Sequence, residues 1–403
     1  MRQFWTIVGF EYRKILRRRS TWAALAAALI FALLNSQLYL MGGSYINGEY
    51  LESNRQAMEK DRGYALALSG RPMDGELLTE AARAYQAIPQ DAELYQATQE
   101  YQQTARPYEP IWLMMSNFYT EEEVLAMTPD LAAEFYARRS ALVAKDIAEM
   151  SAGDATKAAL LAWDAKIKTP WTYRSTAGYE TFLTALEFVG FLAAFAGAVC
   201  LAPLFAGEYS RGTDPILRSA RHGRGLLAWA KLLAGTTVQL AMFGLTAGAS
   251  WLSFLLSYGF DNGDAPLQMM AWRYNYPLTL LQCTLLCVLC VMAASLMQAA
   301  LTMLLSARLK TPFAVVIVVT VLMLAPMMFD LPKRPLWPLL LYNLLPVRMM
   351  KFSNIFSPAP YELPGAVAPQ YVVFPAFALL AALALVFLAA RCYRRRPNLD
   401  LCW

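Results

Sequence analysis

Six long apolar runs occur along this chain, and they constrain its fold more than any other feature. A helix that crosses the hydrocarbon core of a membrane needs about 20 mostly apolar residues. The runs near or above this length are Thr21–Met41, Phe182–Ala206, Leu226–Tyr258, Leu278–Leu305, Pro312–Phe329 and Val372–Ala390. Because only 16% of the residues are charged, against roughly 25% in soluble domains, we predict an all-α polytopic membrane protein with six transmembrane helices.

Lys and Arg residues are concentrated in four segments that alternate along the predicted spans. These segments are 1–20, 207–231, the short link 306–311 and the tail after residue 390. Loops on the cytoplasmic side of membrane proteins carry an excess of Lys and Arg. We therefore expect all four segments, and both termini with them, to be cytoplasmic.

The segment 43–181 has the opposite charge. It contains 21 acidic and 13 basic residues, a net charge of −8 in a chain whose total is +5. Thr120 and Glu123 are spaced as a capping box, and Thr128 precedes a proline suited to the first position of a helix. We predict an inserted helical domain on the extracytoplasmic side. Its many aromatic residues either form its core, which is the commoner role, or bind an amphipathic ligand.

These observations divide the chain into four parts. Residues 1–20 are predicted to form an amphipathic cytoplasmic helix at the membrane interface, with a helical extension of the first span as the alternative. Residues 21–41 form the first transmembrane helix, and 43–181 the extracytoplasmic domain. Residues 182–403 hold transmembrane helices two to six, the cytoplasmic segment 207–231 and a cytoplasmic tail. Before the last span, the proline-rich stretch around Trp337–Leu345 is predicted to be re-entrant or interfacial.

Membrane topology explains the basic segments, so no nucleic-acid partner is needed. Their side chains are expected to lie beside lipid headgroups, which makes the lipid bilayer the predicted partner. All six cysteines lie outside 43–181, and no Asn-x-Ser/Thr sequence occurs, so neither a disulfide framework nor glycosylation is indicated. We predict a location in the plasma membrane of a bacterial cell.

Common catalytic motifs are missing from the sequence. There is no Gly-x4-Gly-Lys-Ser/Thr loop for nucleotide phosphates, no His-Glu-x-x-His and no Gly-x-Ser-x-Gly. His222 is the single histidine, which leaves few ways to build an acid–base or zinc site. We therefore predict that the chain is not an enzyme and has no catalytic residues, metal or cofactor of its own.

A few polar or sulfur-containing residues lie inside the apolar runs. Glu187, Gln239 and Asn35 are candidates for a translocation path. The alternatives are a position at the outer interface for Glu187 and interhelical hydrogen bonds for the other two. The face formed by Cys283, Cys287 and Cys290 is suited to close helix packing, and a soft-metal site is the less favoured alternative.

The stretch GEYSRGTDPILRSARHGRGLLAWAKL, which begins at Gly207, places an unusual number of charges between two apolar runs. Glu208 stands where one run ends, Gly212 and Thr213 follow, and Pro215 opens a short predicted helix, Ile216–Ala220. Lys231 stands where the next run begins. A solvated loop would account for the number of charges. It would account less readily for their order, in which an acid at the end of one apolar run is followed by Gly-Thr, a short helix and a lysine at the next run.

The order of these residues resembles the cytoplasmic coupling segment of type-2 ATP-binding-cassette exporter permeases. The resemblance is carried by Glu208–Thr213, Ile216–Ser219, Arg221–Gly225 and Ala230–Leu232. It extends to the architecture, with an amphipathic N-terminal helix, six spans and a proline-broken segment before the last one. The large domain after the first span departs from the minimal pattern and looks like that of bacterial members with a long first outer loop.

This resemblance implies a pore-forming subunit that works with a separate ATP-binding-cassette ATPase, which would hold ATP and Mg²⁺, and with a second permease chain, the same or different. Residues implied in coupling to the ATPase are Glu208, Arg211, Gly212, Thr213, Arg218 and Arg221.

The expected function is export of a hydrophobic or amphipathic substrate such as a peptide, a drug or a lipid-like molecule. The main alternative is a membrane sensor whose extracytoplasmic domain detects a ligand and signals through the ATPase. A third, an intramembrane enzyme, would need catalysis without any ATPase partner.

Overall fold

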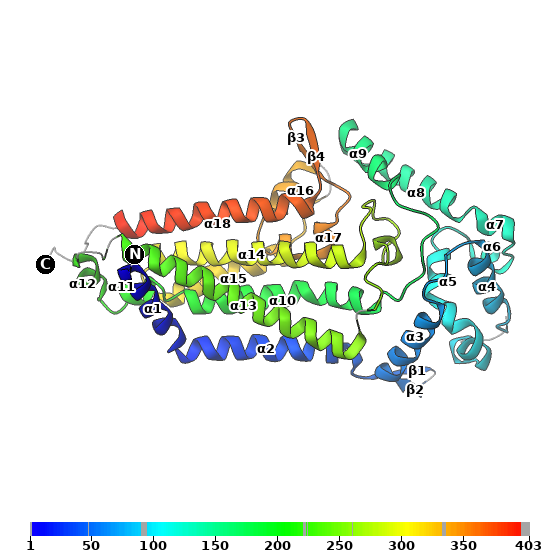
Figure 1. The fold of residues 1–403 in the computed structure, drawn as a ribbon, viewed down its shortest axis with the longest axis horizontal. Helices are drawn as coiled ribbons and strands as arrows, with labels where there is room; N and C mark the ends of the chain where they lie inside the picture. The colour runs from blue at the N-terminus through cyan, green and yellow to red at the C-terminus, as the bar shows by residue number, and fades with distance from the viewer. Residues whose placement is uncertain are drawn as a thin grey trace.

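The computed structural model describes residues 2–46, 48–89, 95–220, 223, 225–259, 261–332 and 336–395. It is elongated, with a bundle of long helices at one end and a group of short helices at the other (Figure 1). Residues 2 and 395 both lie at the far end of the bundle, here called the terminal end. The group of short helices is called the α3–α9 domain, and the end of the bundle next to it the domain end.

Within the described residues, five helices are long and apolar enough to cross a membrane. They are α2 (Arg19–Leu40), α10 (Ala177–Leu201) followed by the short α11 (Ala206–Tyr209), α13 (Leu226–Tyr258), α14 (Leu280–Arg308) and α18 (Gln370–Arg395). Each overlaps one of the predicted spans, and α13 has the predicted bounds. The chain is therefore a mostly helical protein with several membrane-spanning helices.

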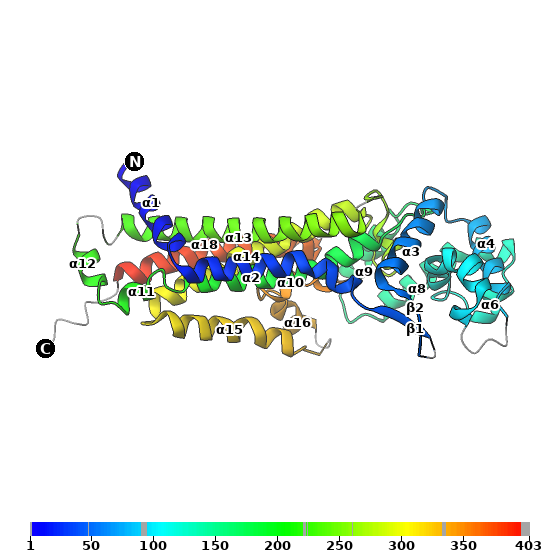
Figure 2. The same ribbon diagram turned by 90° about the horizontal axis from the view of Figure 1, so that it is seen from below.

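The fifth predicted span along the chain corresponds to α15 (Pro312–Met328), which is shorter than the five helices named above. Its 17 residues extend over roughly 26 Å at a rise of 1.5 Å each, whereas the hydrocarbon core is about 30 Å thick. The helix ends because Phe329 is in an extended conformation. Figure 2 shows α15 running along the bundle. By length and composition, the described residues contain five candidate spans and one shorter apolar helix, so the predicted count of six is not confirmed.

The bundle packs through small residues that let its helices approach closely. A β-carbon added at Gly190 of α10 would come within 2.2 Å of Val291 on α14. A β-carbon added at Gly197 of α10 would come within 1.6 Å of the Gln239 side chain on α13. Close packing of this kind is what holds helices together in a membrane, where apolar surface alone gives little preference for a protein neighbour over lipid.

The N-terminal residues form a separate helix, α1 (Arg2–Leu16), so the alternative of a continuous first span is wrong. The chain is extended at Arg18, and α2 begins at Arg19. Val8, Glu11 and Ile15, three or four residues apart, form the buried face of α1, which packs across α13. The predicted apolar face is only partly buried, since Trp5 and Leu16 are exposed.

The α3–α9 domain has a hydrophobic core of its own, which also includes Trp272. Its elements are the strands β1 (Gly43–Ile46) and β2 (Glu49–Ser53), the helices α3 (Asn54–Leu68), α4 (Gly75–Gln86), α5 (Glu109–Met115), α6 (Glu121–Leu125), α7 (Pro129–Ala133), α8 (Phe135–Glu149) and α9 (Asp154–Asp164), and three short turns of helix at Tyr95–Ala97, Tyr101–Ala105 and Arg106–Tyr108. The predicted caps at Thr120 and Thr128 are both present. Most of its aromatic side chains are either buried in its cores, as Phe135 and Trp171 are, or partly buried against them.

Short elements fill the domain end of the bundle. They are the 3-10 turns at Leu267–Met269 and Arg348–Met350, the helices α16 (Leu336–Tyr342) and α17 (Phe352–Ile355), and the strands β3 (Tyr361–Leu363) and β4 (Ala366–Ala368). α16 covers part of the apolar stretch predicted to be re-entrant or interfacial, and its seven residues are too few to cross a membrane. The pairs β1–β2 and β3–β4 correct the all-α prediction, because such short hairpins carry no clear periodic pattern.

Arg139 joins three parts of the chain at the edge of the α3–α9 domain. Its guanidinium forms two hydrogen bonds with Asp164, of 2.7 and 3.1 Å, and donates to the Trp272 carbonyl. We expect Arg139→Ala to lower the free energy of unfolding by about 3–5 kcal/mol, because it leaves a largely buried carboxylate without its partner. Thermal unfolding and limited proteolysis would measure the loss. Arg138→Ala is the control: that side chain pairs with more exposed acids, and an equal loss from both exchanges would contradict the prediction.

Candidate functional site

The candidate site lies at the terminal end of the bundle, beside the interruption between α10, which ends at Leu201, and α11, which begins at Ala206. The hydroxyl of Ser306, on α14, donates to the Ala202 carbonyl at 2.7 Å and accepts from the backbone amides of Phe205 and Ala206. One buried serine thus satisfies three backbone groups that the interrupted helix leaves unpaired. The chain is therefore held at the point where it leaves the bundle.

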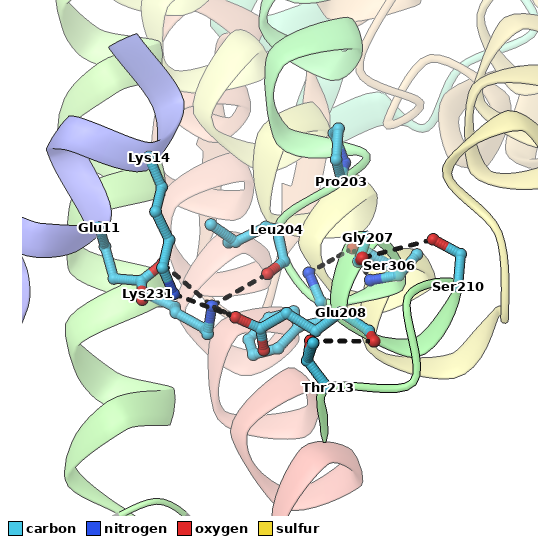
Figure 3. A network of polar contacts seen from close by, with 12 residues as sticks. Glu11, Lys14, Pro203, Leu204, Gly207, Glu208, Ser210, Thr213, Lys231 and Ser306 are labelled. Atoms are coloured by element: carbon cyan, nitrogen blue, oxygen red, sulfur yellow. Dashed lines mark hydrogen bonds and ion pairs between the residues drawn. The ribbon is translucent and has the colours of Figure 1, made fainter. Parts of the chain in front are cut away.

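A cluster of two acids and two lysines, buried except for Lys14, lies beside this break (Figure 3). The Lys231 ammonium, on α13, contacts Glu11 Oε2 at 2.9 Å, Glu208 Oε1 at 2.6 Å and the Leu204 carbonyl at 3.1 Å. Lys14 contacts Glu11 at 2.7 Å and Glu208 at 3.2 Å. The three donors of Lys231 are all used, and the four charges sum to zero. The cluster ties α1, α11 and α13 together.

The charges of their neighbours shift the pKa values of Glu11 and Lys14, the two members of this cluster that lie on α1. Burial by itself would raise the pKa of Glu11, but the two lysines outweigh it and hold the pKa below its usual 4.5. For Lys14, burial would lower the pKa, and the contacts with Glu11 and Glu208 raise it instead. Both groups are therefore charged at neutral pH, which keeps the ion pairs intact.

This shift predicts a specific dependence of stability on pH. Because the pKa of Glu11 is lowered on folding, its stabilising contribution is complete at neutral pH and is lost as the pH falls through the lowered value. We expect the wild type to have a higher unfolding temperature than Glu11→Gln at pH 7, and the gap to shrink below about pH 4.5. Glu59→Gln, at an exposed acid, is the control. A gap for Glu11→Gln that stayed constant down to pH 3 would contradict the assignment.

After α11 the chain turns into a short exposed helix, α12 (Asp214–Ser219). Gly212 supplies the turn with a φ of +66°, a conformation that other residues rarely adopt. The Thr213 amide donates to the Glu208 carbonyl at 3.1 Å, and Pro215 lies in the first turn as predicted. The Ile216 side chain is 73% exposed, so α12 presents an apolar residue away from the bundle.

Arg218 faces the other way, toward the bundle. Its side chain is buried, lies 3.7 Å from Asp214 and stands over the Tyr393 ring of α18 at 5.9 Å. The Tyr393 ring in turn packs on Phe205 with a centroid distance of 4.9 Å. α12 is therefore in contact with the last helix of the bundle as well as with the break after α10.

Five of the six residues predicted for coupling lie in the described part of this site. Glu208 joins the charged cluster, Gly212 and Thr213 form the turn, Arg218 contacts α18, and Arg211 is exposed. Arg221 lies outside the residues that the structure describes. Glu11, Lys14 and Ser306 were not predicted as site residues from the sequence. Glu11 could have been noticed, because it is the one acidic residue among the basic residues of 1–20.

The comparison with protein families agrees with this arrangement. The family model described as ABC-2 family transporter protein matches residues 5–394, nearly the whole chain. The chain belongs to the ABC-2 transporter family. It is thus a membrane-embedded permease of an ATP-binding-cassette transporter, and the family implies an ATPase subunit as its partner. The comparisons with curated proteins and with solved structures found no similar protein.

The three residues predicted for a translocation path lie on three different helices of this permease. Gln239 is buried and donates to the Ala193 carbonyl at 3.3 Å. Asn35 is buried on α2. Glu187 is half-buried on α10, within the electrostatic influence of Lys351 and Arg348. Among the described residues none of the three forms a hydrogen bond with another, and their role in a translocation path stays a prediction.

Cys283, Cys287 and Cys290 of the permease are all buried on α14. Cys290 is oriented toward the Tyr371 carbonyl on α18, at 3.8 Å. In the described part of the chain no group of three or more His, Cys, Asp or Glu residues is placed to hold a metal ion. The three thiols therefore lie at packed helix contacts.

Proposed function

We propose that this permease is the membrane subunit of an exporter in the plasma membrane of a bacterial cell, with its terminal end in the cytoplasm. A separate ATPase subunit, which carries ATP and Mg²⁺, drives it, and a second permease chain completes the path. The substrate is hydrophobic or amphipathic, such as a peptide, a drug or a lipid-like molecule. The observation that carries the proposal is the exposed helix α12 on its buried charged support.

α12 has the form of a docking element. Pro215 and Ile216 are exposed at its surface, which gives it an apolar tip, while Asp214 and Arg218 are directed back toward the chain. An apolar side chain that fills a pocket of a partner is a common centre of binding energy at protein interfaces. The ATPase would supply the groove that receives Ile216.

The charged cluster links this docking element to the spans. A displacement of α12 acts on Glu208 through the Gly212 turn, and Glu208 is bonded to Lys231 on α13. The same displacement acts on α18 through Arg218 and Tyr393. Within the described chain, Glu208 Oε2 and the Tyr393 hydroxyl are buried without a hydrogen-bond partner. A buried polar atom without a hydrogen bond destabilises the conformation that contains it. This favours a second arrangement of this region during the transport cycle.

Co-purification tests the proposal. The intact, tagged chain is extracted from its native membranes in mild detergent, and the proteins that accompany it are assayed for ATP hydrolysis. We expect an ATPase with a phosphate-binding loop to co-purify in a fixed ratio. If none accompanies the chain under conditions that preserve other transporter complexes of the same membranes, the proposal is wrong.

One observation favours the sensor as a second candidate function. A pocket of about 690 Å³ in the α3–α9 domain is lined by Tyr85, Tyr95, Trp112 and Tyr119, and the rings of Tyr85 and Trp112 are stacked 3.9 Å apart. Aromatic walls of this kind bind amphipathic ligands. If Trp112→Ala abolished a ligand response but left ATPase activity and substrate flux unchanged, the sensor would be the better description.

A further inference from the structure

The C-terminal turns of α18 carry three arginines on one face. Arg391, Arg394 and Arg395 are spaced i, i+3 and i+4, and Phe387 lies one turn before them. All three arginines are exposed. Among the described residues none of them pairs with a carboxylate. The face therefore carries three positive charges that pair with no carboxylate of the described residues.

These arginines line a pocket between α18 and the beginning of α13. The pocket has a volume of about 500 Å³ and is lined by Trp229, Phe387, Ala390, Arg391, Arg394 and Arg395. The Trp229 and Phe387 rings meet edge to face with a centroid distance of 5.1 Å. The pocket is thus apolar on one side and strongly basic on the other.

The position of the pocket indicates what fills it. Trp229 lies in the first turn of α13, and the arginines lie in the last two turns of α18. Both places are where membrane-spanning helices reach the headgroup layer, in which Trp side chains are enriched. A guanidinium group binds phosphate oxygens through paired hydrogen bonds, and basic pockets between spans on the cytoplasmic side bind lipid headgroups.

We propose that this pocket binds the phosphate of one anionic phospholipid from the membrane leaflet at the terminal end. The arginines contact the phosphate, and the glycerol and upper acyl carbons lie against Trp229 and Phe387. Tyr393 is on the same turns of α18 and contacts Phe205 and Arg218, so the bound lipid stabilises the end of the helix against which α12 rests. Only this last consequence depends on the proposed function.

Native mass spectrometry of the purified full chain tests lipid binding without any ATPase. The chain is titrated with phosphatidylglycerol, which is anionic, or with phosphatidylcholine, which is not, and retained lipid molecules are counted. We expect wild type to retain one phosphatidylglycerol that R391Q/R394Q/R395Q retains at least about tenfold more weakly, because charge-assisted hydrogen bonds are lost. W229A, which changes no charge, is also expected to weaken retention.

The control is R13Q/R17Q/K310Q, which removes three exposed basic residues predicted to lie on the same side. We expect it to retain phosphatidylglycerol as wild type does. If the control and the arginine variant lost lipid equally, or if W229A had no effect, the attraction would be one of general charge and the pocket would not be a site. Should the triple variant fail to fold, the three single exchanges give the same comparison.

Inorganic phosphate distinguishes the two possible sources of the phosphate group. A lipid anchored through its glycerol and acyl carbons should stay bound in excess inorganic phosphate. Complete displacement by phosphate alone would mean that the pocket is an anion site, and it would overturn the lipid assignment. If lipid binding is established and no ATPase co-purifies, the proposed function fails while this inference stands.

Discussion

Lys231→Met is expected to destabilise the protein more than any other single exchange at the terminal end. The side chain is 1% exposed, and its removal leaves Glu11 and Glu208 buried with the half-exposed Lys14 as their remaining ion-pair partner. Breaking a buried ion pair in this way costs about 3–5 kcal/mol. The unfolding temperature in detergent and the yield of folded protein would measure the effect.

Two matched variants show whether charge is the cause. Lys14→Met removes the same charge from a side chain that is 44% exposed, so it should cost about 1 kcal/mol or less. Glu11→Gln/Lys231→Met leaves one acid and one lysine and should recover most of the stability lost in Lys231→Met alone. If the double variant were as unstable as the single one, packing would be the cause and the charged cluster would have no special role.

Ile216→Glu is expected to separate the permease from its ATPase without unfolding it. Because the side chain is 73% exposed, the exchange removes little packing within this chain. It places a charge where the proposed interface buries an apolar side chain, and the loss of such an anchor is worth at least 2 kcal/mol, or about thirtyfold in affinity. The fraction of ATPase that co-purifies would measure the loss.

Arg13→Glu is the control, because it introduces the same carboxylate, with a larger change of net charge, at an exposed position of the same end. It should leave co-purification unchanged, and both variants should keep the unfolding temperature of wild type. Unchanged ATPase association in Ile216→Glu would mean that α12 does not dock the ATPase through its tip.

The long helices could be predicted because their apolar length is a local property of the sequence. The predicted and observed bounds of α13 coincide, and Pro215 marked the start of α12 correctly. α15 was overestimated, since apolar composition continues to Phe329 although the helix ends at Met328. The strands β3 and β4 have three residues each, too few for an alternating pattern to be recognised.

The charged cluster could be predicted only in part, because its members come from distant segments. Glu208 and Lys231 stood out as charges at the two ends of one connection. Glu11 is 220 residues from Lys231 in the sequence, and no local pattern indicates that α1 crosses α13 at that point. The pairing depends on how whole helices pack, which a single sequence does not record.

Site-specific photo-crosslinking shows directly whether α12 contacts the ATPase. A photoreactive amino acid is placed at Ile216 or, for comparison, at Tyr45, which lies on β1 of the α3–α9 domain and is 66% exposed. The complex is irradiated in native membranes after co-purification has identified the ATPase. We expect a crosslinked adduct between the permease and the ATPase from position 216 and none from position 45. An adduct from position 45, or none from position 216 while the ATPase is bound, would contradict it.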